Sequence, residues 1–114
     1  MNSQETFTHI ELKLTQLIMI TEKLKYYILF NHNKFETTLN EFTTLLIEES
    51  HWMNSQLSDQ FKPTDPNLNN YKNLITFLNE HPFNITKNGD SCQTINHYQL
   101  MIFDSLTYYK SYTN

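Results

Sequence analysis

The chain has 114 residues and a formal net charge of −4 at pH 7, from 12 acidic residues and 8 lysines. A chain of this length forms one small domain, which excludes an enzyme with a cleft between two lobes. The hydrophobic residues make up 39% of the sequence and are mostly large, because Ala and Val are absent. We therefore expect residues 1–114 to fold as a single domain around one apolar core.

The charged residues do not favour nucleic acid as a partner. The sequence has no Arg, so it lacks the guanidinium group that binds phosphates and base edges through paired hydrogen bonds. The lysines are scattered along the chain, and no basic stripe can follow a phosphate backbone. We expect no nucleic-acid partner.

The cysteine content and the apolar runs indicate a cytoplasmic protein. Cys92 is the single cysteine and cannot form an internal disulfide. The first twenty residues contain Glu5 and Glu11, where a secretory signal would carry positive charge before an apolar run. The longest apolar runs are far shorter than the roughly 20 residues that cross a bilayer. We expect a cytoplasmic location and no membrane contact.

The first half of the chain predicts two long helices. Apolar residues follow one another at steps of three and four in segments 7–30 and 34–61, which is typical of amphipathic helices. Residues 31–33 favour turns over helix interiors, and Asn33 is expected to cap the second helix. The predicted core positions are Ile10, Leu14, Leu17, Thr21, Leu24 and Ile28, then Phe35, Leu39, Phe42, Leu46, Ser50, Met53, Leu57 and Phe61.

The second half predicts two shorter helices. Two prolines in segment 62–66 mark the main connection, with Asp65 as a helix cap and Pro66 at the first helical position. The third helix then ends near His81, and the last one begins near Asp90. Segment 83–86 alternates like a short strand, although a hairpin there is not favoured. Short connections favour antiparallel neighbours, so the predicted fold is all-α, an up-and-down four-helix bundle with two long and two shorter helices.

Residue patterns that carry chemistry are weak in this sequence. Glu48 and His51 have the spacing of a di-metal ligand pair, but both are predicted to face solvent, and a second such pair is missing. Cys92 and His97 are five residues apart and lie mostly on different sides of a helix. A single glycine leaves no phosphate-binding loop. We expect no catalytic residue, no cofactor-binding residue and no metal ligand.

The helix predicted over 7–30 has more apolar surface than one core-facing stripe requires. Relative to Leu17, a second set of large side chains points about 180° to 220° away. Either another part of the chain covers this second side, namely the last helix or segment 82–92, or another molecule does. Trp52 is predicted to project off the core stripe of its own helix, and Trp is frequent among interface anchors. The predicted partner-binding residues are therefore Leu12, Met19, Tyr26, Phe30 and Trp52.

These patterns favour a non-enzymatic protein that binds another protein or a second copy of itself. A small chaperone, an adaptor or an inhibitor would act in this way, and a homodimer would bury the same side of the helix. An immunity or anti-defence protein that blocks a toxin or nuclease is the first alternative, although its acidic residues would be more concentrated than here. The second alternative is a small metalloprotein or enzyme that uses Glu48, His51 or Cys92.

Overall fold

The computed structural model describes residues 3–59, 66–81 and 85–113. Within these ranges the regular elements are four α-helices: α1 (Ser3–Leu29), α2 (Phe35–Asp59), α3 (Pro66–Glu80) and α4 (Ser91–Thr113). Two helices are long and two are shorter, as predicted, although α4 with 23 residues approaches α2 with 25. The predicted end of the second helix at Phe61, the Asp65 cap and the start of the unfavoured hairpin at residues 83–84 lie outside the described residues.

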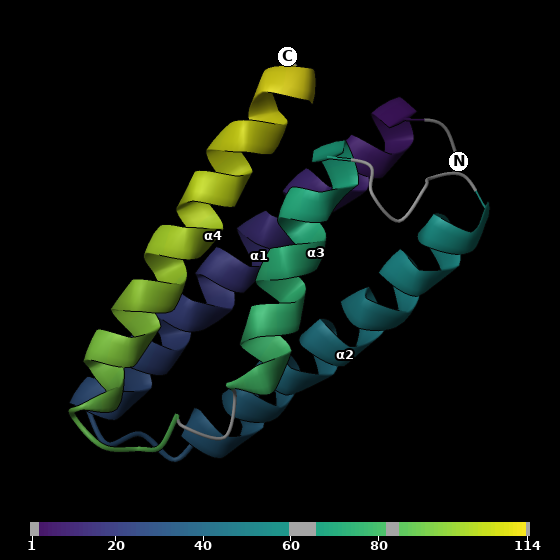
Figure 1. Ribbon diagram of the computed structural model, residues 1–114. Coiled ribbons are helices and arrows are strands. Elements are labelled where there is room, and N and C mark those ends of the chain that lie inside the picture. The colour runs from purple at the N-terminus through teal and green to yellow at the C-terminus, as the bar shows by residue number, and fades with distance from the viewer. Residues whose placement is uncertain (1–2, 60–65, 82–84, 114) are drawn as a thin grey trace.

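The helices form the predicted up-and-down bundle. Successive helices run in opposite directions, and α3 lies in front of α1 in the view of Figure 1. Each helix packs against the helices next to it in the chain, and α4 closes the ring along α1, where the helix contact is most extensive. The bundle measures 43 × 26 × 18 Å along its principal axes. Because α3 lies in front of α1, the side of α1 turned away from α3 is the far side in Figure 1.

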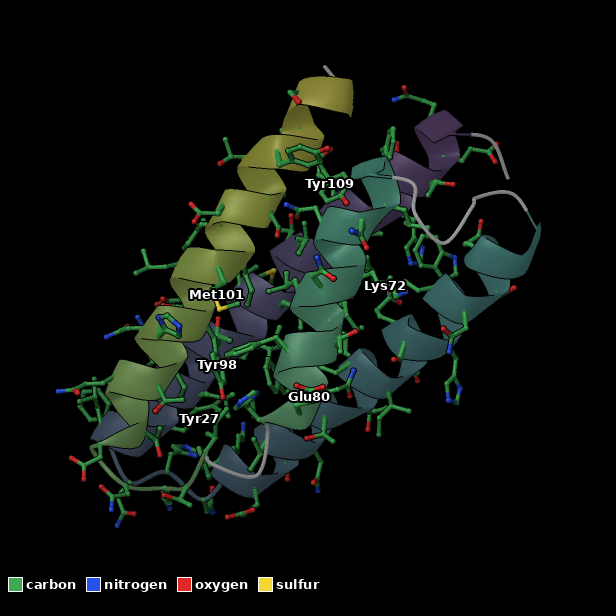
Figure 2. The ribbon with its side chains drawn as sticks, in the orientation of Figure 1. Tyr27, Lys72, Glu80, Tyr98, Met101 and Tyr109 are labelled. Carbon is green, nitrogen blue, oxygen red and sulfur yellow. The ribbon has the colours of Figure 1, made fainter. Side chains whose placement is uncertain are left out.

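The core contains the predicted stripe of α1 and the predicted α2 residues Phe35, Phe42, Leu46 and Met53. Leu39 and Ser50 are only half-buried, and the side chains of Leu57 and Phe61 lie outside the described part of the chain. On α1, the buried side chains recur at steps of three and four. Thr21 lies buried among them, and its hydroxyl is satisfied because it donates to the carbonyl of Ile18 at 2.8 Å. Tyr98 and Tyr109 reach inward from α4 (Figure 2). Among the described residues, no helix is long and apolar enough to cross a membrane. The largest fully buried side chains include Ile10, Leu14, Leu17, Leu24, Phe35, Phe42, Leu46, Leu68, Tyr71, Ile75, Leu78 and Tyr109.

The turn between α1 and α2 is where the sequence predicts a break. Asn31 has a φ of 48°, in the left-handed region that Asn tolerates better than most residues at the end of a helix. The expectation that Asn33 caps the next helix is corrected, because α2 begins at Phe35 and Lys34 occupies the cap position. In the turn before it, the imidazole Nδ1 of His32 accepts a hydrogen bond from the Lys34 backbone N–H at 3.0 Å. The ring of His32 also lies 4.8 Å from that of Tyr27, and this contact fixes it over the turn.

The described part of the connection into α4 is held by short polar contacts. The hydroxyl of Ser91 accepts a hydrogen bond from the Thr86 backbone N–H at 3.0 Å, and the Asn88 side chain accepts one from Asp90 N–H at 2.9 Å. Ile85 is buried against the core. Residues 85–90 contain no strand, so these contacts lead the chain into α4 without forming a sheet.

Candidate functional site

The outer face of α1 is the side opposite its core stripe, and we define it by Leu12, Met19, Tyr26 and Phe30. Each of these side chains is more than half exposed, whereas Leu17 on the other side of the helix is fully buried. The first three are seven residues apart, so they lie one above another along the helix. Neither α4 nor the described part of segment 82–92 covers them. The outer face of α1 is therefore an apolar surface that the described chain leaves in contact with solvent.

The two ends of the outer face of α1 have different shapes. At the start of the helix, a shallow hollow is lined by Thr8, Glu11, Leu12 and Thr15. At the other end, the rings of Tyr26 and Phe30 pack together with their centres 4.6 Å apart. The face thus has a depression at one end and a pair of aromatic rings at the other.

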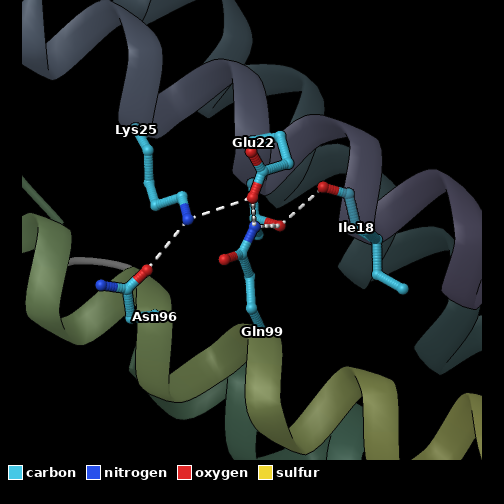
Figure 3. A network of polar contacts seen from close by, with 6 residues as sticks. Ile18, Glu22, Lys25, Asn96 and Gln99 are labelled. Carbon is cyan, nitrogen blue, oxygen red and sulfur yellow. Dashed lines mark hydrogen bonds and ion pairs between the residues drawn. The ribbon is translucent and has the colours of Figure 1, made fainter.

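A polar network fixes how α4 lies beside this face (Figure 3). The side-chain amide of Gln99 donates to Thr21 Oγ1 at 3.0 Å and to Glu22 Oε1 at 2.6 Å. Lys25 Nζ lies 3.0 Å from Glu22 Oε1 and donates to Asn96 Oδ1, also at 3.0 Å. The hydrogen bond from Gln99, and then the hydrogen bond and positive charge of Lys25, hold the pKa of Glu22 below its usual value. These contacts set the level of each residue of α4 against α1.

That register extends the apolar surface onto α4. Since the two helices are antiparallel and Gln99 lies opposite Thr21, residues that follow Gln99 lie level with α1 residues that precede Thr21. Leu100 and Phe103 follow Gln99 on α4, so they lie near the level of Met19. Both side chains are exposed. The exposed apolar surface is consequently broadest at the middle of the outer face of α1.

Trp52 is not the exposed anchor that the sequence suggested. It is half-buried against the core, and its ring stacks on the imidazole of His9 with the centres 3.8 Å apart and the planes 16° apart. It also meets the ring of Tyr71 edge-on at 6.4 Å. The helical position of Trp52 was predicted correctly, but its exposure was not, because α1 contributes a histidine that packs over the indole.

A buried carboxylate at Glu49 joins three helices behind this stack. Glu49 on α2 is 3% exposed. Its Oε1 accepts a hydrogen bond from the Tyr71 hydroxyl of α3 at 2.8 Å and lies 2.7 Å from His9 Nε2 of α1. The hydroxyl of Tyr109 on α4 accepts a hydrogen bond from the backbone N–H of Tyr71 at 3.0 Å, so α4 is also connected to these residues. We call Glu49, His9 and Tyr71 the Glu49 cluster.

The electrostatics of the Glu49 cluster keep Tyr71 protonated. Burial first, and then the negative charge of Glu49, raises the pKa of the Tyr71 phenol well above its usual value. The phenol therefore remains a hydrogen-bond donor over the whole range in which proteins are ordinarily stable. A carboxylate can only accept, so the imidazole carries a proton on Nε2.

The Glu49 cluster was not predicted from the sequence. The apolar spacing placed Ser50, and not Glu49, in the core stripe of the second helix. Ser50 is half-buried, while Glu49 is buried. Glu49 follows Leu46 by three residues and precedes Met53 by four, which is the spacing of the stripe itself. The position could have been found, but a lone Glu in a core stripe gives no indication of which distant His and Tyr bind it.

The other candidate residues lie apart from one another. Glu48 and His51 are both exposed, as predicted. Cys92 is half-buried with a free thiol, and His97 is exposed. In the parts of the chain that the structure describes, no three His, Cys, Asp or Glu side chains come together as metal ligands would. Comparison of the chain with known family models, with curated proteins and with solved structures finds no match.

Proposed function

We propose that this chain is a non-enzymatic protein-binding module that buries the outer face of α1 against a helix of another polypeptide. The observation that carries the proposal is the exposure of Leu12, Met19, Tyr26 and Phe30 on one side of a helix whose other side fills the core. Water around large apolar side chains is unfavourable, and an apolar surface that the fold itself does not cover marks a binding surface.

The spacing of these residues supports a helical partner. Side chains seven residues apart form a straight seam, and a second helix with the same repeat can insert its side chains between them. Lys23 and Glu22 flank the seam and are exposed, which supplies the polar rim of such an interface.

The size of the surface indicates what the partner must supply. Burying the exposed half of one such side chain contributes about 1 kcal/mol, whereas micromolar binding needs about 8 kcal/mol. The outer face of α1 alone therefore does not support stable binding, and the partner must bring apolar surface of its own. A small chaperone, an adaptor or an inhibitor would meet this description. A cytoplasmic location belongs to the same proposal, since Cys92 is the sole cysteine of the chain.

The proposal is tested by capturing the partner with the immobilised chain from an extract of the cells that make it. We expect Met19→Asp to abolish capture, because a carboxylate in the middle of the seam must be desolvated on binding. Ile47→Asp is the matched control, since Ile47 is an exposed aliphatic residue on α2. Both variants should keep the helical circular dichroism of the parent chain. Equal capture by the parent chain and Met19→Asp contradicts the proposal.

A further inference from the structure

The shape of the outer face of α1 suits one partner in particular. The residues around its hollow are Thr8, Glu11, Leu12 and Thr15, at positions i, i+3, i+4 and i+7 of the helix. Four residues at this spacing form the hole that receives one side chain of a partner helix in knobs-into-holes packing. The hole of α1 is thus already shaped for a knob.

The same face carries a matching knob. Tyr26 lies fourteen residues after Leu12 on the same side of the helix, about 21 Å along the axis, and its ring is exposed and packed on that of Phe30. If two copies of α1 pack antiparallel, with Met19 opposite Met19, Tyr26 of each copy reaches the hollow of the other. A parallel pair would instead place ring against ring and hollow against hollow.

We propose that the partner on the outer face of α1 is a second copy of this chain, packed antiparallel about a two-fold axis at Met19. The inference rests on the proposed function and names its partner. A two-fold interface requires that a surface be complementary to itself, and a face with a hole at one end and a knob at the other, equally far from Met19, meets that requirement.

The charges beside the seam fit the same arrangement. A two-fold axis across an antiparallel pair brings the same flank of both helices together. Glu11 and Lys25 lie on the flank of α1 that faces α4, eight residues before and six residues after Met19. Glu11 of one copy therefore comes near Lys25 of the other, and this occurs twice. Opposite charges therefore meet across the antiparallel interface.

The exposed apolar residues of α4 lie at the centre of this interface. Leu100 and Phe103 are level with Met19, so the axis passes close to both of them. In the dimer, Leu100 of one copy approaches Phe103 of the other. The broadest part of the exposed apolar surface is thus buried at the axis, where the interface excludes water best.

Sedimentation equilibrium and disulfide trapping test this inference. We expect the full chain to have twice its mass of 13.7 kDa across the micromolar range. Met19→Asp should yield the single-chain mass, whereas Ile47→Asp should remain a dimer. In a Cys92→Ser background, Met19→Cys should oxidise to a covalent dimer, while Leu12→Cys should not, because the two copies of residue 12 lie on opposite sides of the axis and about 21 Å apart.

The outcomes separate this inference from the proposed function. A single-chain mass for the parent chain at all concentrations overturns the dimer. If Met19→Asp then still loses a captured partner, the proposed function stands with a different occupant. Trapping by Leu12→Cys together with Met19→Cys contradicts the antiparallel arrangement. A dimer that Met19→Asp leaves intact contradicts the placement of the interface on α1.

Discussion

The outer face of α1 and the Glu49 cluster reverse the usual distribution of side chains. In the first, large apolar residues face solvent; in the second, a carboxylate lies in the interior. The structure accounts for the carboxylate, because Tyr71 and His9 bind it from two other helices. It gives no such account of Leu12, Met19 and Tyr26 from within the described chain. A buried polar group has its hydrogen-bond partners inside the fold, whereas an exposed apolar surface indicates a partner outside it.

This difference predicts opposite roles for the two regions. Substitutions in the Glu49 cluster should change the free energy of unfolding of the single chain and leave its binding to a partner unaffected. Substitutions on the outer face of α1 should change binding to a partner and leave the free energy of unfolding of the single chain unaffected.

The largest effect is expected for Glu49→Ala. This change leaves the Tyr71 hydroxyl and the His9 imidazole without their acceptor in the interior, and each buried donor left unsatisfied costs about 1–3 kcal/mol. Glu48→Ala is the control, since Glu48 is adjacent and exposed, and it should change the free energy of unfolding by less than about 0.5 kcal/mol. Urea denaturation measures both. Similar losses for the two variants would mean that the buried carboxylate is not a structural centre.

A smaller effect is expected for Tyr71→Phe, which removes only the hydroxyl. The free energy of unfolding should fall by about 1–2 kcal/mol at neutral pH, because Glu49 loses one donor but keeps its contact with His9. The variant should also differ from the parent in alkali. The folded-state pKa of Tyr71 is raised, so the folded state holds this proton more tightly than the unfolded chain does.

The sign of the alkaline effect follows from that proton. The stability contributed by Tyr71 is fully present below the unfolded pKa of about 10 and is lost as the pH rises above it. The parent chain should therefore lose stability more steeply than Tyr71→Phe between about pH 10 and pH 11. The two chains differ only at residue 71, so the difference between the two profiles isolates Tyr71. Parallel profiles would show that the phenol ionises freely.

The fold was largely predictable from the sequence, and the Glu49 cluster was not. Periodic apolar residues such as Leu14 and Leu17 decide helix faces locally, and prolines such as Pro66 decide helix ends, so both are visible in one segment. The contact between His9 and Glu49 joins residues 40 apart, and it depends on how α1 and α2 settle against each other. Neither helix alone contains that information.

The position of Trp52 shows the same limit on a smaller scale. Its place on α2 followed from helical geometry, but its burial depends on the imidazole that α1 lays over it. The exposure of Met19 and Tyr26 was more tractable. In a bundle of four helices each helix has one side that faces neither neighbour, so an apolar residue opposite the core stripe is exposed whichever helices flank it.

The smallest effect is expected for Met19→Ala, measured at a protein concentration at which the chain is monomeric. Met19 is 57% exposed, so truncating it should change the free energy of unfolding by less than about 0.5 kcal/mol. Met53→Ala is the matched comparison, because Met53 is 3% exposed and its loss leaves a cavity that costs about 2–5 kcal/mol. The two changes delete the same atoms from helices of the same bundle. If Met19→Ala destabilised the monomer as much as Met53→Ala, the side chain would be packed within its own chain, and the outer face of α1 would not be available to a partner.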